Sequence, residues 1–443
     1  MQRVAYNRWS WPVNRIDRGL GWNGMLAFLV ERHAVEKPVR TAIPMLAFAV
    51  VVLVLPDARA ADAPPSPVAA LEQALAAQPG DAVLAYFLAM FRAREGDVEG
   101  TLDALEQTLA QGSGFLPPSD RFAAVKDDPR FAVLRARFER RLPVKTDGRI
   151  AFALPDRGLI PEGIAFDPRS STFFVGSIAR NAIHRVDARG RMHRFSQAGD
   201  ALDAVLGLAV DAAARRLYAV STSALTAAGR ERLRNAIKVY DLDAGRLLRT
   251  IDVPQARQLN DIAIVPGATL LVTDSAGGGV WRIGIDGGGV SALVPQDAAR
   301  GVNGIAVTPD GKVAYLAAAR RPLRVDVATG AITPLQPPGG ENVAAIDGLY
   351  WHDGALIGIQ NLTNAGRVIR LVLGDDGRSI ASVQTLQSHH QRAFDEPTTA
   401  TITPDGLYVL ARTQVTRFND EGRIDRPQAL KQPLVLRIPL GAG

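Results

Sequence analysis

A four-residue step recurs along the last two thirds of the chain and constrains its fold more than any other feature. The step most often carries Gly at its second position and then enters an apolar run. Its first positions are residues 162, 206, 260, 303, 347 and 398, which lie 44, 54, 43, 44 and 51 residues apart. Repeats of this length are typical of four-stranded propeller blades. The sequence therefore predicts a mainly β fold, a six-bladed β-propeller over residues 149–443.

The predicted propeller needs a strand that closes its ring. The last repeat shows only three strands, the third of which lies in the run 434–440. Residues 149–154 form a spare β-rich run ahead of the first repeat. We expect this run to pair with 434–440, because an open ring would leave unpaired strand edges.

Two further segments precede the propeller. Residues 1–60 read as a leader: Lys37 and Arg40 precede the apolar run 41–55, and an Ala-Arg-Ala site follows. This pattern predicts a secretory signal peptide cleaved near Ala60, and hence a periplasmic or secreted protein. An uncleaved anchor is the alternative, although 15 apolar residues are short for a bilayer span of about 20. Translation could start at Met1 or at Met25, and the sequence alone leaves both starts open.

Residues 61–148 are predicted to be a small helical segment. Helical patterning covers 67–78, 81–94 and 98–111, with Gly and Pro at the breaks. The helix-turn-helix over 81–114 is 34 residues long and resembles a single tetratricopeptide-like unit. Because one repeat forms little of a groove, we favour a helical cap that packs on the propeller over a docking surface for a protein partner.

Composition excludes some classes of function. The chain has no Cys, which excludes disulfides, thiolate zinc sites and cysteine nucleophiles. Much of the net charge of +6 lies in residues 1–60, with eight basic and four acidic groups; the remainder has 43 basic and 41 acidic groups. No basic block with interleaved aromatic residues stands out, so no nucleic-acid partner is indicated.

Oxygen donors occupy four of the six first positions of the step, namely Glu162, Asn260, Asn303 and Asp347. The innermost strands of a propeller begin around its axis, so we expect these side chains to converge there on a divalent metal. Calcium is the first choice, because it takes 6–8 oxygen ligands; Mg²⁺, Mn²⁺ or Zn²⁺ are alternatives, zinc being disfavoured without His or Cys. The competing interpretation is that Asn-Gly and Asp-Gly pairs mark only turns.

The residues around these steps resemble a known family. Residues 161–163, 259–261, 303–304 and 346–348 resemble the motifs of the senescence-marker-protein, gluconolactonase and luciferin-regenerating-enzyme-like propellers, with paraoxonases as more distant relatives. The resemblance implies a divalent metal held by the residues Glu162, Asn303 and Asp347. It also implies that Asn260 contacts substrate or metal, and that Asp347 is the general base.

Further candidates lie near the expected mouth of the site. Sugar-lactone members often carry Arg two residues before the position of Asn260; here Gln258 stands there, with Arg257 one residue earlier. Other candidate substrate contacts are Asp274, Arg412 and Glu396, the last also a candidate extra ligand. Two insertions, 221–236 and 414–433, are expected to rim the mouth.

His389 and His390 precede the sixth blade on the same side as the mouth. We interpret them as part of a solvated loop, with substrate contact as the alternative.

These features predict a metal-dependent hydrolase that cleaves a lactone or related ester. The cation would polarise the carbonyl, and the carboxylate of Asp347 would activate water. The alternative is a non-catalytic propeller that binds a ligand or protein and keeps the metal as a structural element. No stable membrane insertion is expected after cleavage of the signal.

Overall fold

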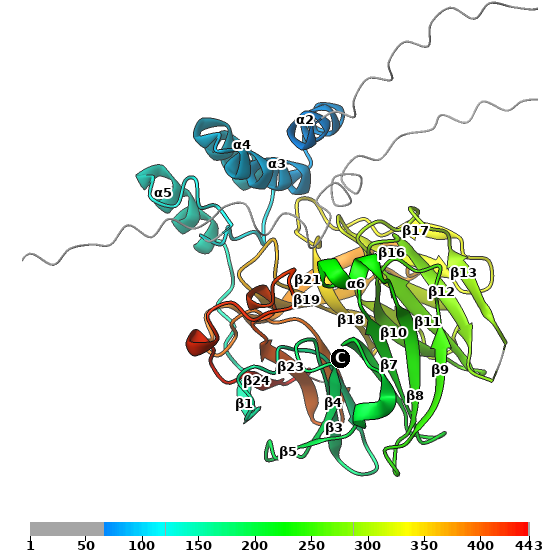
Figure 1. The fold of residues 1–443 in the computed structure, drawn as a ribbon. Coiled ribbons are helices and arrows are strands. Elements are labelled where there is room, and N and C mark those ends of the chain that lie inside the picture. Colours follow the sequence, from blue (N-terminus) through cyan, green and yellow to red (C-terminus); the bar gives the residue numbers. More distant parts are fainter. Residues whose placement is uncertain (1–65, 120, 287, 442–443) are drawn as a thin grey trace, which may run out of the picture.

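The computed structural model describes residues 66–119, 121–286 and 288–441. It consists of a helical segment and six four-stranded antiparallel sheets, the blades of a propeller (Figure 1). The fold predicted from the repeat is confirmed. The predicted leader, residues 1–60, lies outside the described residues.

Four helices precede the propeller, and each begins where a polar side chain caps its first turn. They are α2 (Pro67–Ala77), α3 (Ala82–Glu95), α4 (Val98–Gln111) and α5 (Pro129–Glu139). The capping side chains accept hydrogen bonds from first-turn amides, and they are Ser66, Asp81, Asp97 and Asp128. Among the described residues, no helix has the length and apolar character needed to cross a membrane.

The first three blades follow the chain from the axis outward. Blade one contains β2 (Pro161–Asp167), β3 (Thr172–Ser177), β4 (Ala182–Val186) and β5 (Met192–Arg194). Blade two contains β6 (Ala204–Asp211), β7 (Arg216–Thr222), β8 (Asn235–Asp241) and β9 (Leu247–Asp252). Blade three contains β10 (Leu259–Val265), β11 (Thr269–Asp274), β12 (Gly279–Gly284) and β13 (Val290–Val294).

The last three blades repeat this order, and blade six takes its outer strand from the start of the propeller. Blade four contains β14 (Ile305–Val307), β15 (Val313–Ala317), β16 (Pro322–Asp326) and β17 (Ile332–Pro334). Blade five contains β18 (Ile346–His352), β19 (Ala355–Gln360), β20 (Arg367–Leu373) and β21 (Ile380–Ser388). Blade six contains β22 (Ala400–Thr403), β23 (Gly406–Arg412), β24 (Leu434–Ile438) and β1 (Arg149–Ala153).

Strand β1 closes the ring, as the spare run predicted. It pairs antiparallel with β24, with Arg149 opposite Arg437 and Ala153 opposite Leu434. The amide of Leu154 extends the pairing to the carbonyl of Pro433 at 2.9 Å. The blade therefore joins residues from both ends of the propeller, and β24 is paired on both sides, by β23 and by β1.

The recurring step forms a bulge at the head of the innermost strand. In β2, residues 162 and 163 lie between the paired positions Pro161 and Ile164, opposite the single residue Gly176 of β3. The same register shift occurs in β6, β10 and β18. A bulge re-aims the side chains of its residues relative to the regular pleat. The first two residues of the step therefore depart from the regular alternation of the strand in these four blades.

Glycine in the step is required by close packing between blades. A Cβ on Gly163 would lie 1.9 Å from the carbonyl oxygen of Leu206, and one on Gly304 would lie 2.5 Å from that of Asp347. Each glycine thus faces the first residue of the next step. The ring is narrow enough at its axis that only a hydrogen fits at these positions.

One end of the ring, at which the innermost strands begin, is called the mouth face here. Both insertions lie on it, and they contact each other. Helix α6 (Ala227–Glu231) lies between β7 and β8, and the amide of Ala227 donates to the carbonyl of Asp420 at 2.8 Å. Arg230 pairs with the Asp420 carboxylate. The insertions of blades two and six therefore meet over blade one.

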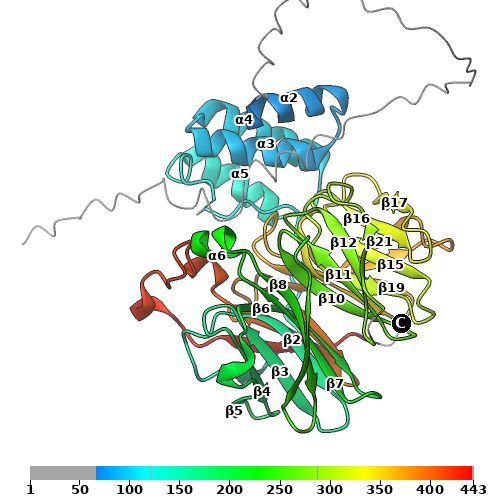
Figure 2. The ribbon, with the colours of Figure 1, turned by 45° about the vertical axis from the view of Figure 1, so that its right-hand side comes forward.

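The helical segment packs on the same face. In both views α2–α5 lie at the end of the propeller that carries α6 (Figure 1, Figure 2). Asp81 at the start of α3 pairs with the buried Arg320 between β15 and β16. The amide of Leu116 donates to the carbonyl of Thr363 at 3.1 Å, and Leu362 packs against the core of the helices. The helical segment thus packs on the loops of blades four and five.

Candidate metal centre and active site

The side chains at the heads of the innermost strands, Glu162, Asn260, Asn303 and Asp347, are called the axial cluster here. Asp347 accepts a hydrogen bond on each of its carboxylate oxygens. The amide Nδ2 of Asn303 donates to its Oδ1 at 2.7 Å, and Nδ2 of Asn361 donates to its Oδ2 at 2.6 Å. Asn361 follows β19 and also donates to the carbonyl of Pro397 at 2.8 Å. Burial is the largest effect on the carboxyl and raises its pKa to about 7, against the two amide bonds, which lower it.

Glu162 lies beside Asp347. Its Oε2 is buried and has no hydrogen-bond partner among the described residues. Burial, then the charges of Asp347 and Glu396, raise the pKa of Glu162 well above its ordinary value. Its backbone carbonyl accepts a hydrogen bond from the hydroxyl of Thr399 on blade six. The side chain of Thr398 acts against the causes that raise the pKa of Glu162. The buried Oε2 is thus available for a ligand.

Two side chains that the sequence argument did not select also belong to the cluster. Asp261 takes the place of glycine in the third step, and its Oδ2 accepts from the amide of Ile305 in the next blade at 3.1 Å. Burial raises its pKa to about 6. The hydroxyl of Tyr350 accepts from the amide of Ala400 at 2.7 Å, and burial, followed by Asp261, raises its pKa well above the ordinary value.

Asn260 is held by its neighbours at the first position of the third step. Its Nδ2 donates to Oγ of Ser275 at 2.8 Å, and that hydroxyl donates to the carbonyl of Val302 at 2.6 Å. With the amide nitrogen fixed in this way, the side-chain carbonyl oxygen of Asn260 is its available acceptor.

Glu396 is placed near the axial carboxylates from the loop before blade six. Its charge acts on both Glu162 and Asp347. Its Oε1 accepts from the amide of Thr416 at 3.0 Å, and its backbone has a positive φ of 62°. Burial is the first cause of its raised pKa, while Arg121 of the helical segment lowers it.

The other predicted substrate contacts, Asp274, Arg257 and Arg412, are not part of the axial cluster. The carboxylate of Asp274 is fully buried and accepts from the amides of Arg257 and Gln258 at 2.9 and 2.7 Å and from the Trp281 indole at 3.2 Å. It therefore supports the loop that leads into β10. The Arg257 side chain is exposed, and Arg412 lies 3.6 Å from Asp395.

The residues at the axis fit a cation. The charges of Asp261 and Glu396 are among the causes that raise the pKa of Asp347, and Glu162 is raised in turn by Asp347. Several carboxylates in a buried site ionise together only if a positive charge compensates them. The unpartnered Oε2 of Glu162 and the amide oxygens nearby are hard donors, which suit a hard divalent cation.

Comparison with known proteins gives structural neighbours only. No protein-family model matches the chain, and no curated protein matches its sequence. A glucose dehydrogenase-type oxidoreductase from Thermus thermophilus matches at a TM-score of 0.46 and 19% identity, over 66% of this chain and 99% of that chain. A calcium-binding protein, regucalcin, from Agrobacterium tumefaciens matches at 0.45 and 17%, over 68% and 98%. A luciferin-regenerating enzyme matches at 0.43 and 16%, over 64% and 92%.

Because the sequence identities to these neighbours are low, the neighbours show the fold alone. The chemistry of the site follows from the residues of this chain. The tetratricopeptide resemblance of α3 and α4 stays a prediction.

Sequence reasoning missed Asp261, Tyr350 and Asn361 for different reasons. Asp261 and Tyr350 lie within the step itself, at its second and fourth positions, so a comparison of all four positions would have selected them. Asn361 lies in a loop between β19 and β20, where the repeat gives no signal.

Proposed function

We propose that the chain is a metal-dependent hydrolase, with calcium as its cation, that cleaves a lactone or related ester at the axial cluster. The observation that carries the proposal is the buried, unpartnered Oε2 of Glu162 beside the amide-bound carboxylate of Asp347. A propeller that served only as a scaffold would gain nothing from these buried charges, since each costs free energy unless it is compensated.

Glu162, Asn303 and Asp347 would hold the cation, with Asn260 as the fourth candidate. When bound, the cation polarises the carbonyl of the substrate and favours the oxyanion that develops there. Asn303 can bind both Asp347 and the cation. Its Nδ2 donates a hydrogen bond to Asp347, and its Oδ1 remains free to act as a metal ligand.

Asp347 is suited to act as the general base. Each carboxylate oxygen has two lone pairs, and each accepts one amide hydrogen bond. Of the two lone pairs that remain, one would bind the cation and the other can take the proton of an attacking water molecule. Asn303 and Asn361 hold the carboxylate from opposite oxygens, which limits its rotation during that transfer. General bases act best when their pKa is close to the working pH.

Asn260 is suited to orient the substrate. Ser275 fixes its amide nitrogen, so its carbonyl oxygen can accept a hydrogen bond from a substrate hydroxyl. Arg257 and Arg412 remain proposed substrate contacts on the mouth face.

A hydrolysis panel tests the proposal. The tag-free protein is loaded with calcium and assayed against γ- and δ-lactones, sugar-acid lactones and aryl esters, with chelated protein as the control. We expect turnover that disappears on chelation and returns with calcium. Glu162→Gln should weaken calcium binding in calorimetry, because it removes one of the ligand charges. Calcium binding at the axis without turnover on the whole panel would instead favour a non-catalytic propeller with a structural metal.

A further inference from the structure

A second group of metal-ligand side chains lies between the helical segment and the propeller. Glu139 is the last residue of α5, and His389 and His390 follow β21. Within the part of the chain that the structure describes, these residues form the one group of three His, Asp or Glu whose ligand atoms all lie within 4.8 Å of one another. The group shares no residue with the axial cluster.

The spacing of the ligand atoms suits a bound ion. Nε2 of His389 lies 3.2 Å from Oε1 of Glu139, and the two imidazole rings have centroids 4.1 Å apart. Two ligands of a tetrahedral zinc, each about 2.0–2.1 Å from the metal, lie about 3.3 Å apart. The separation in the structure is therefore close to that of two ligands of one metal.

Surrounding groups hold each side chain in a fixed orientation. Arg135 approaches Oε2 of Glu139 at 3.4 Å, which leaves Oε1 toward His389. Oγ of Ser388 lies 3.0 Å from the carbonyl of Lys145 and 2.9 Å from Nδ1 of His390. If the hydroxyl donates to the carbonyl, it accepts from Nδ1–H, and Nε2 of His390 then carries the lone pair. Such second partners fix the tautomer of metal-binding histidines in many proteins.

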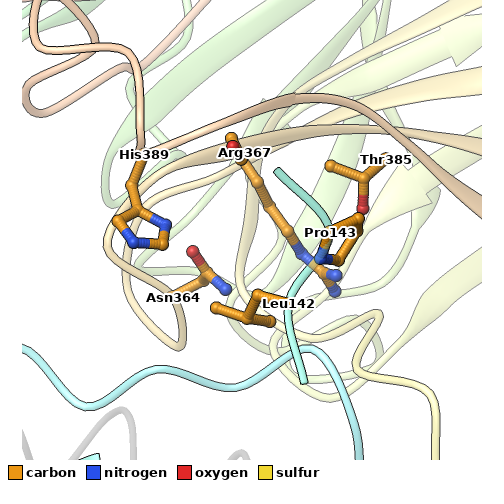
Figure 3. A pocket seen from close by; sticks show the side chains of 7 residues that line it. Leu142, Pro143, Asn364, Arg367, Thr385 and His389 are labelled. Carbon is orange, nitrogen blue, oxygen red and sulfur yellow. The ribbon is translucent and has the colours of Figure 1, made fainter. Parts of the chain in front are cut away.

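His389 is largely enclosed where the helical segment meets the propeller. Its side chain is mostly buried, and its Nδ1 is a buried atom without a hydrogen-bond partner among the described residues. It lines a cavity of about 10 Å³ together with Asn364, Arg367 and the chain at Leu142 (Figure 3).

We propose that Glu139, His389 and His390 bind a zinc ion that joins the helical segment to the propeller. Two imidazoles and one carboxylate form a borderline-soft donor set, unlike the all-oxygen set at the axis. The three protein ligands leave a fourth position for water. The molecule would thus hold two metals of different chemistry, calcium on the axis and zinc at the interface between its two parts.

Calorimetry on the full mature chain without a purification tag tests the zinc site. The titration of zinc is made in excess calcium, which occupies the axial site. We expect one equivalent of zinc to bind the parent protein. Loss of a partner outside the ligand shell costs about 10–100-fold in metal affinity, so loss of the ligand in His390→Ala should cost more than about 100-fold. His193→Ala is the matched control, since His193 is exposed on β5 of blade one.

A second measurement separates loss of the ligand from loss of the fold. Zinc should raise the melting temperature of the parent and of His193→Ala but not that of His390→Ala or Glu139→Gln, while all four melt alike without zinc. If a variant does not fold, His390→Gln replaces it, since Gln keeps a polar side chain beside Ser388. Zinc affinity in the variants equal to that of the parent, or no equivalent bound by the parent, would overturn the proposal.

Discussion

At the scale of single residues, the axial cluster combines firm hydrogen bonding with unfavourable charge. Asn303 and Asn361 donate to both oxygens of Asp347, yet the pKa of that carboxyl is about 7 because burial outweighs both bonds. Burial, followed by the charge of Asp347, also raises the pKa of Glu162 well above its ordinary value, and its Oε2 has no hydrogen-bond partner in the described part of the chain. Such groups are costly in the folded protein unless a cation is bound, which links calcium, protonation and stability.

Replacement of Asp347 tests its proposed role as the general base. Asp347→Asn keeps an oxygen donor for the metal but removes the proton acceptor. At saturating calcium, we expect kcat to fall by about 10²–10⁴-fold, the range found for loss of a general base. Asp353→Asn is the control, because Asp353 lies at the opposite end of the same innermost hairpin and Asn tolerates its positive φ of 46°. Turnover close to that of the parent would remove Asp347 from this part and point to Glu396.

The stability of the metal-free protein should depend on pH through the same residues. Asp347 and Glu162 have pKa values above those of the unfolded chain, so the folded state binds more protons between about pH 4 and pH 7. The free energy of unfolding should therefore fall as the pH rises through this range.

Calcium should reverse that loss, and its stabilising effect should be larger at pH 8 than at pH 5. Urea unfolding at both pH values, with chelator and with calcium, measures the difference. Glu162→Gln should flatten the metal-free pH dependence, since the residue no longer ionises. A pH profile that is unchanged in this variant would show that Glu162 is not one of the groups responsible.

At the scale of elements, the head of each innermost strand determines where the functional side chains lie. A bulge at the first two residues of the step interrupts the regular pairing in β2, β6, β10 and β18. The glycine that follows allows the next blade to approach. The metal donors therefore depend on backbone geometry that the neighbouring blades share.

Gly304→Ala tests that dependence. A Cβ at this position would lie 2.5 Å from both the carbonyl oxygen of Asp347 and the amide nitrogen of Leu349. Because these are backbone atoms, the two blades must separate, and we expect a loss of about 1–3 kcal/mol in the free energy of unfolding together with weaker calcium binding. Gly339→Ala is the control, since its Cβ would meet nothing within 4 Å. Equal stability of the two variants would contradict the packing argument.

Strand β1 should contribute to stability through closure of the ring. Two truncated chains can be compared, one that begins at residue 148 and one that begins at 154. Both lack the helices, so the difference between them reports β1 alone. We expect the shorter chain to melt at a lower temperature or to aggregate, because β24 becomes an unpaired edge. Equal melting temperatures would mean that the ring closes without β1.

At the scale of the whole molecule, the helical segment and the two insertions occupy the face of the propeller on which the axial cluster opens. Asp81 and Leu116 fasten the segment to blades four and five, and Arg121 acts on the charge of Glu396. These contacts support the interpretation of the segment as a cap. Docking of a protein partner on its outer surface stays a prediction.

Export is predicted at this scale. The charged flank, the apolar run 41–55 and the Ala-Arg-Ala site predict cleavage after Ala60. N-terminal sequencing of the protein from its native host should therefore begin at or next to Ala61. A membrane-bound product that still carries residues 41–55 would support an anchor instead.

The sequence alone was enough to determine the repeat, the six blades and the closing strand, and the structure confirms each of them. It was enough because a blade is a local unit, and the step that begins each blade has a fixed place in it. The same period predicted that Glu162, Asn303 and Asp347 would lie at equivalent positions, and Asn303 and Asp347 are in direct contact.

Only the tertiary structure decided how the loops and the helical segment use that framework. Asp274 is a buried support because it accepts from four donors, two in the loop before β10, one in the turn after β11 and one on β12, which its position at a strand end did not reveal. Glu139 and His389 meet across 250 residues. Such residues are brought together by loops of different lengths, which the repeat does not relate to one another. Their contacts therefore depend on how the helical segment packs on the propeller.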